Sequence, residues 1–203
     1  AMLSWGLYGL LSVAFIWLMG RMPMPRAVAA VPMLTSLILA PAWPDPAAGQ
    51  FIAVMAGIVI LFAGSALWRV WRVNGAWLDA AQIVAVALGG FFVSYAQFVT
   101  VLPGEDTRFA LIALGFALLP AIGAALGWSK ARDDLRFAML TLSAGLLVVI
   151  AAILGLAEWS LPVTIAAVSA ALLLIGEKAQ DRWVRHGALV YLSGALLALM
   201  GTA

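Results

Sequence analysis

Cysteine is absent from this sequence of 203 residues, histidine occurs once, and charged residues make up only 10%. The absence of cysteine excludes disulfide bonds and thiolate chemistry. The lone histidine, His186, cannot build a transition-metal site without several carboxylate ligands. The low charge excludes a water-soluble globular domain, in which about a quarter of the residues are charged.

Hydrophobic residues make up 66% of the chain, and the mean hydropathy is +1.11. A chain with so little polar surface is expected to be an integral membrane protein. Eight runs approach or exceed the roughly 17 to 20 apolar residues that a membrane-crossing helix needs. They cover about 2–20, 27–43, 50–68, 78–102, 108–128, 136–157, 161–177 and 187–202. The sequence therefore predicts one all-α domain over residues 1–203, a polytopic bundle of about eight transmembrane helices in antiparallel hairpins.

The cations of the chain predict its orientation. All but one of the 11 Lys and Arg residues fall in the first, third, fifth and seventh breaks, and Arg108 is the exception. The ten are Arg21, Arg26, Arg69, Arg72, Lys130, Arg132, Arg136, Lys178, Arg182 and Arg185. Because Lys and Arg mark cytoplasmic loops, we expect a multi-pass protein of the bacterial inner membrane with both termini on the non-cytoplasmic side. The cations form no continuous basic patch, so we expect no nucleic-acid partner.

Two stretches carry a resemblance to a known family. "LILAPAWPDPAAGQFIAVMAGIVILFAGSALWR" (37–69) is an apolar helix, a Trp-Pro-Asp-Pro turn and a helix rich in Ala and Gly. "ILGLAEWSLPVTIAAVSAALLLIGEK" (153–178) repeats the plan with a short acidic turn. Together they resemble the very large bacterial membrane proteins of domain-of-unknown-function family two-three-three-nine. The resemblance implies that this chain is a fragment of a longer array of hairpins, and it implies no activity and no functional residues.

Ionisable residues at membrane depth are the usual sign of function in a membrane protein, because burying a charge there is costly. The nine acidic residues lie in the breaks or at the ends of the apolar runs. This distribution argues against a carboxylate-centred proton or sodium carrier. Asp133 and Asp134 are interpreted as capping the following helix and pairing with nearby cations. We therefore expect neither an enzyme nor a bound cofactor or metal.

Polar residues do interrupt one apolar run, in "GGFFVSYAQF" (89–98). Gly90, Ser94 and Gln97 follow helical spacing and share one face, called here the polar stripe, with Tyr95 beside it. Pro120 should bend the next helix. In one interpretation the stripe is a packing seam where another helix approaches closely and Ser94 and Gln97 bond across the contact. In the other, these side chains line a polar cavity beside the bend. The packing seam is preferred because no charge accompanies the stripe.

Small residues also recur at close-approach spacing elsewhere, in Ala53/Gly57 and Gly123/Gly127. The seventh break adds three cations, Lys178, Arg182 and Arg185, which either contact anionic lipid headgroups or only enforce topology. The predicted function is a non-enzymatic scaffold or assembly domain of a larger envelope protein, with membrane lipids and other transmembrane helices as partners. The alternative is a transporter or lipid-handling protein for a neutral or amphipathic molecule.

Overall fold

The computed structural model describes residues 2–21, 30–44, 46–72, 75–99, 104–130 and 132–201, and helices and short turns account for all of them. Helix covers 86% of the described residues and no strand occurs among them, so the predicted all-α class is confirmed. The elements are α1 (Met2–Arg21), α2 (Ala30–Leu39), α3 (Ala48–Ile58), η2 (Val59–Gly64), α4 (Ser65–Val70), α5 (Trp77–Phe98), α6 (Asp106–Gly127), α7 (Leu135–Gly155), η3 (Glu158–Ser160), α8 (Leu161–Lys178) and α9 (Arg182–Gly201).

Within the described residues, six helical segments are long and apolar enough to cross a membrane, whereas the sequence predicted about eight. They cover Ala48–Val70, Trp77–Phe98, Asp106–Gly127, Leu135–Gly155, Glu158–Lys178 and Arg182–Met200. The first two predicted runs correspond to shorter apolar helices, Ser4–Leu18 and Ala30–Leu39. Residues 27–29 of the predicted span 27–43 lie outside the described residues, and its described helix, α2, covers 10 residues and gives way to a turn at Ala40. At 1.5 Å per residue it rises about 15 Å, half the thickness of the hydrocarbon.

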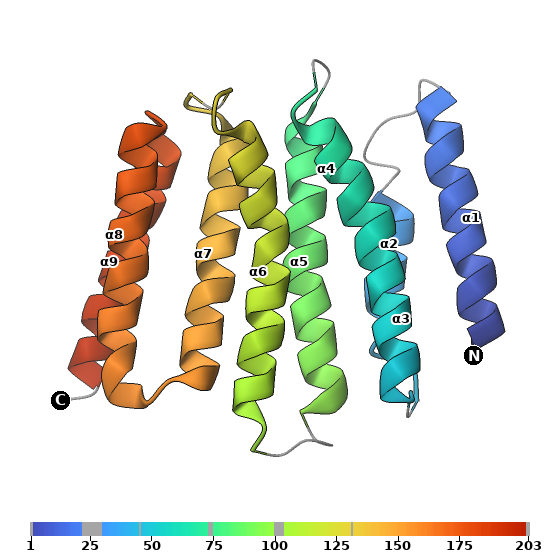
Figure 1. Ribbon diagram of the computed structural model, residues 1–203, viewed down its shortest axis with the longest axis horizontal. Helices are drawn as coiled ribbons and strands as arrows, with labels where there is room; N and C mark the ends of the chain where they lie inside the picture. The colour runs from blue at the N-terminus through green and yellow to red at the C-terminus, as the bar shows by residue number, and fades with distance from the viewer. Residues whose placement is uncertain are drawn as a thin grey trace.

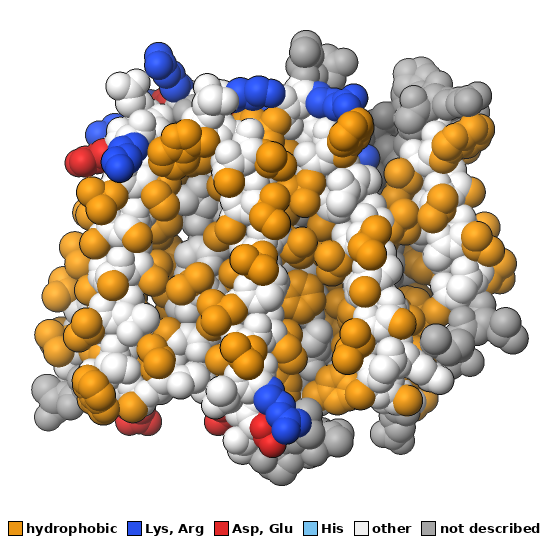
Figure 2. Space-filling model, viewed as in Figure 1, with side chains coloured by type: hydrophobic (Ala, Val, Ile, Leu, Met, Phe, Trp, Pro, Cys, Tyr) orange, Lys and Arg blue, Asp and Glu red, His pale blue; other side chains and the backbone are white. Residues whose placement is uncertain are grey.

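The helices stand side by side between two opposite ends (Figure 1). The chain enters at the beginning of α1 and leaves at the end of α9 at the same end of the bundle. The turns that follow α4, α6 and α8 lie at the other end, where Lys and Arg side chains gather (Figure 2). Between the two ends, apolar side chains are spread over the visible face (Figure 2). Many large apolar side chains of the described residues are exposed, for example Leu10, Ile60 and Leu118 at 70%, 74% and 60%. Such a continuous apolar surface is what a membrane protein presents to lipid.

The core is divided among several clusters along the row of helices. Phe137, Leu140 and Ile83 anchor one where α4 to α9 meet near the cationic end. A second joins α2 and the α3–η2–α4 helix to α5 around Phe62 and Met55. A third joins α5, α6 and α7. Alanine is frequent in these clusters because small side chains allow helix backbones to approach closely.

The two small-residue pairs predicted as close contacts have different outcomes. Trp71 packs on Gly127, where an added Cβ would overlap the indole ring, and its Nε1–H donates to the Gly123 carbonyl at 2.6 Å. The Gly123/Gly127 prediction is thus confirmed. Among the described residues, nothing lies within 4 Å of a Cβ added to Gly57, so the Ala53/Gly57 prediction is wrong. Small residues four positions apart permit another helix to approach closely, but the position of the neighbouring helix determines whether it does.

Candidate functional site

Gly90 faces the aromatic ring of Phe116 on α6. A Cβ added at Gly90 would lie 2.5 Å from Phe116 Cε1 and 2.8 Å from Cζ, well inside van der Waals contact. The adjacent Gly89 is just as close to α2, since its added Cβ would lie 2.9 Å from Leu37 Cδ1. Because neither glycine has a side chain, residues of α2 and α6 pack directly against the backbone of α5.

The polar groups of the stripe are satisfied within the protein, although in different ways. Ser94 is buried, and its hydroxyl donates to the Gly90 carbonyl of its own helix at 2.7 Å. The sequence-based expectation of a cross-helix bond from Ser94 is thus wrong, because a serine hydroxyl easily reaches the carbonyl four residues earlier. Gln97 does bond across elements: its Nε2 donates to the carbonyl of Trp43, in the turn after α2, at 3.2 Å.

Tyr95 and Pro120 complete the set of residues singled out in the sequence. The Tyr95 ring packs edge-on against Phe109 of α6, with ring centroids 4.9 Å apart, and lies 6.0 Å from the Phe91 ring. Pro120 is fully buried inside α6, one turn beyond the Phe116 ring that covers Gly90. Ser94, Tyr95 and Gln97 line neither the cavity among α1, α2 and the α3–η2 helix nor the cavity among α6, α7 and α8.

A second polar group, which the sequence interpretation missed, lies between α5 and the α3–η2–α4 helix. Gln82 is buried and its Nε2 donates to the Phe62 carbonyl at 3.0 Å. Phe62 belongs to η2, a π-helical turn, whose wider spacing disrupts the ordinary ladder of backbone bonds. Arg69 Nε donates to the buried carboxylate of Asp79 at 3.0 Å, and its Nη2 lies 3.4 Å from Gln82 Oε1. The sequence signal was available, since a lone glutamine in an apolar run needs a partner.

Three aspartates connect the turn between α6 and α7 with the turn between α8 and α9 at the cationic end. Asp181 is fully buried, and its carboxylate accepts from the Val184 N–H at 3.0 Å and from the Asp134 N–H at 3.1 Å. Asp134 in turn caps α7, accepting from the Arg136 N–H at 2.9 Å. Asp133 forms an ion pair with Arg182 at 3.0 Å. The capping role predicted for Asp134 is confirmed, and these carboxylates serve helix ends and ion pairs.

The charge on Asp134 is stabilised by its cation. Burial by itself raises the pKa of this carboxyl, but the hydrogen bonds and positive charge of Arg136 outweigh that effect and hold the pKa below its ordinary value of 3.8. Arg136 also donates from Nη1 to the carbonyl of Val70 at 2.8 Å, which links α7 to the end of α4. Asp134, Arg136 and Asp181 therefore form a structural junction that connects α7 with α4 and α9.

The predicted lipid-contacting cations all lie exposed near the turn between α8 and α9. Arg182 is paired with Asp133 and stacks on Trp183, with its guanidinium 5.3 Å from the ring centroid. The aliphatic part of the Arg185 side chain packs against Gly176. Lys178 forms no salt bridge within the described part of the chain. Arg185 likewise forms no salt bridge with a described residue, so Arg182 is the one of the three whose charge is paired within the described part.

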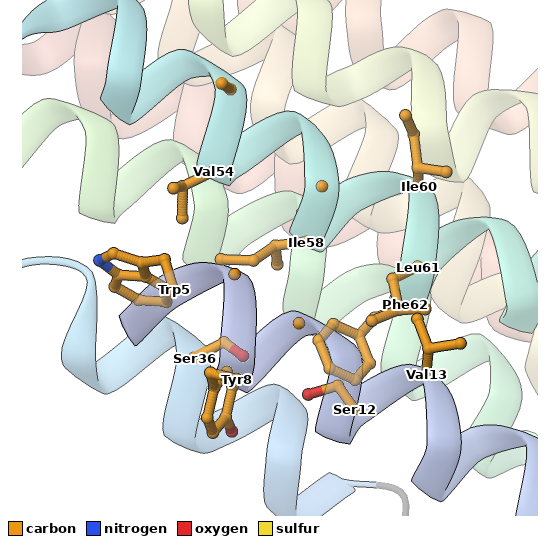
Figure 3. A pocket seen from close by; sticks show the side chains of 14 residues that line it. Trp5, Tyr8, Ser12, Val13, Ser36, Val54, Ile58, Ile60, Leu61 and Phe62 are labelled. Carbon is orange, nitrogen blue, oxygen red and sulfur yellow. The ribbon is translucent and has the colours of Figure 1, made fainter. Parts of the chain in front are cut away.

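A cavity of about 470 Å³ lies among α1, α2 and the α3–η2 helix (Figure 3). Its walls are mostly apolar, including Ile58 and Phe62. Two of its polar groups are engaged by one backbone oxygen, because Tyr8 Oη and Ser36 Oγ each donate to the Pro32 carbonyl at 2.7 Å. The cavity therefore offers a bound molecule mainly apolar contact.

Comparisons with protein-family models, with characterised proteins and with solved structures found no match to this chain. The resemblance to family two-three-three-nine stays a prediction.

Proposed function

We propose that this chain is a multi-pass domain of the bacterial inner membrane that acts as a non-enzymatic scaffold, assembling with other transmembrane helices of a larger envelope protein. One observation carries the proposal: the polar stripe is occupied by protein. Phe116 covers Gly90, Ser94 bonds to its own helix, and Gln97 bonds to Trp43. A transporter would need those groups free to contact a substrate.

The placement of charge supports the same proposal. The Asp, Glu, Lys, Arg and His residues of the described helices lie in the first or last two turns, as Asp79, Arg136 and Lys178 illustrate. No metal-binding group of three or more His, Cys, Asp or Glu residues occurs in the described part. A scaffold needs helix surfaces, whereas ion carriers and metalloenzymes need charges or ligands at depth.

The proposed topology has eight crossings in four hairpins, with both termini outside the cytoplasm. α1 and α2 would supply the two crossings beyond the six long helices, and the short α2 would require a locally thinned bilayer. Single cysteines test the orientation without interference, because the chain has none. In spheroplasts, a membrane-impermeant maleimide should label Glu158→Cys at once and Ser129→Cys only after permeabilisation. The reverse order would overturn the orientation.

Cysteines in the stripe separate the scaffold from a carrier. Ser94→Cys and Gln97→Cys should react slowly with a small water-soluble thiosulfonate in native membranes, compared with Ser129→Cys as the exposed reference. Rapid reaction at both positions would mean that water reaches the stripe. That result would reject the packed interpretation and favour transport.

The assembly role makes its own prediction. Extracted in a mild detergent from the membrane in which it is naturally made, the chain should migrate in a complex larger than its own 21.3 kDa. A monomer at low detergent concentration would contradict the scaffold.

The alternative is the handling of a neutral or amphipathic molecule. The cavity among α1, α2 and α3 favours this alternative, because its 470 Å³ lies within the roughly 300–1,000 Å³ of ligand pockets. Transport or exchange of a fluorescent lipid in proteoliposomes, absent from empty liposomes, would promote this function over the scaffold.

A further inference from the structure

A second cavity, of about 360 Å³, lies among α6, α7 and α8 near the cationic end. Figure 1 shows α7 between α6 and α8, and residues of all three helices line the cavity. Along α7 it extends from Phe137 to Val148, roughly 16 Å at 1.5 Å per residue. Alanines and one glycine form much of the lining, which leaves the space unfilled by side chains.

Thr141 is the unusual residue of this cavity. It is 6% exposed, and its hydroxyl is buried without a hydrogen-bond partner among the described residues. Threonine in a helix ordinarily donates to a carbonyl one turn earlier, as Thr164 does to Ser160 at 3.0 Å. A buried hydroxyl left unpaired is costly, so the arrangement calls for an acceptor supplied from outside the protein.

Water does not meet this need. A buried water molecule requires two to four polar partners, and the only polar side chains of the lining are Thr141 and, at the end of α6, Trp128. The ligand must therefore bring a long apolar body together with its own hydrogen-bond acceptor. An acyl chain with its ester carbonyl has this combination.

The charge around the cavity specifies the headgroup. On α8, Val168, Ala171 and Ile175 line the cavity, and Lys178 continues the same face one turn further toward the cationic end. Lys178 is exposed, and so is Arg132 in the turn beyond the cavity-lining Trp128. Within the described residues neither cation forms a salt bridge, so both remain available to a phosphate.

We infer that the groove among α6, α7 and α8 binds one anionic phospholipid. An acyl chain lies along α7, the Thr141 hydroxyl donates to an ester carbonyl, and the headgroup lies at Lys178 and Arg132. The inference goes beyond the proposed scaffold role and requires only that the protein reside in a membrane.

Lipid titration of the delipidated, detergent-purified protein tests the site. Binding of dioleoylphosphatidylglycerol, counted by native mass spectrometry, should exceed that of dioleoylphosphatidylcholine by several-fold. Thr141→Val keeps the shape and removes the donor, and it should weaken binding of both lipids about five-fold, the effect of losing one hydrogen bond of ordinary strength. Lys178→Gln should reduce the preference for phosphatidylglycerol about five-fold.

Matched variants provide the controls. Ala171→Phe fills the groove and should abolish specific binding, whereas Ala170→Phe, on an exposed and non-lining position of α8, should not. The controls for Thr141→Val and Lys178→Gln are Thr164→Val and Arg72→Gln, at residues that do not line the groove. Both control variants should bind lipid like wild type.

Thr141→Val should also unfold no more easily than wild type without lipid, because it removes an unpaired hydroxyl, so weaker binding cannot be ascribed to misfolding. Equal binding of the two lipids, or full binding by Ala171→Phe, would overturn the inference. Those outcomes would leave the scaffold untouched, since its own test is the size of the native complex.

Discussion

Replacing Gly90 by alanine tests whether α5 and α6 are in close contact at the stripe. In an open helix the change stabilises by about 0.8–1 kcal/mol, because glycine is a poor helix former. At Gly90 the new methyl would lie 2.5 Å from Phe116 Cε1, about 1 Å inside contact distance. Overpacking of this kind costs about 1–3 kcal/mol, so the net effect should range from neutral to about 2 kcal/mol of destabilisation.

Gly115 provides the matched control. It lies in α6, one residue before Phe116, and has nothing within 4 Å of an added Cβ. Gly115→Ala should therefore show the full stabilisation, and the two alanine variants should differ in unfolding free energy by about 1–3 kcal/mol. Reversible unfolding with sodium dodecyl sulfate in mixed micelles, followed by tryptophan fluorescence, measures both.

A double-mutant cycle attributes the difference to the contact itself. Phe116→Leu replaces the ring that covers Gly90 by a smaller side chain. It should therefore recover part of the unfolding free energy lost in Gly90→Ala and leave the effect of Gly115→Ala unchanged. Gly90→Leu should destabilise more than Gly90→Ala. Equal stability of the Gly90 and Gly115 variants, without coupling to Phe116, would refute the close approach and return the stripe to the cavity interpretation.

Three further predictions concern buried polar groups. Asp181→Ala removes a helix cap and leaves the Asp134 N–H unpaired, so the unfolding free energy should fall by about 2–4 kcal/mol in the same assay. Gln82→Leu leaves the Phe62 carbonyl without its hydrogen bond and should lower the unfolding free energy by about 1–3 kcal/mol. Gln97→Leu should lower it less, because the Gln97 bond is longer and only partly buried. Equal losses of unfolding free energy would contradict this ranking. Because the pKa of Asp134 is lowered by folding, its stabilisation is complete above the unfolded value near 3.9 and declines as the pH falls through the lower folded value. Melting from pH 6 to pH 2.5 should therefore fall more steeply in wild type than in Asp134→Asn.

The sequence by itself determined the class of the protein and the limits of several of its long helices, although the runs 78–102 and 187–202 were less exact, since α5 ends at Phe98 and α9 begins at Arg182. The apolar runs at 50–68, 108–128 and 136–157 became helical segments within about two residues of the predicted ends at each terminus. The physical reason is local: hydrophobic runs, turn residues and capping aspartates act through neighbours in the chain. The Asp134 cap was predictable for the same reason.

Only the tertiary structure decided which small residues became contacts and which polar groups were satisfied. Gly57 and Gly127 have the same kind of sequence context, yet Gly127 meets Trp71 and Gly57 borders a cavity. Gln82 and Thr141 both lie in apolar helices, but the π-helical turn offers Gln82 a carbonyl, while the Thr141 hydroxyl has no partner among the described residues. These outcomes depend on how one helix is placed against the next, and helical periodicity states only the face on which a residue lies, not what that face meets.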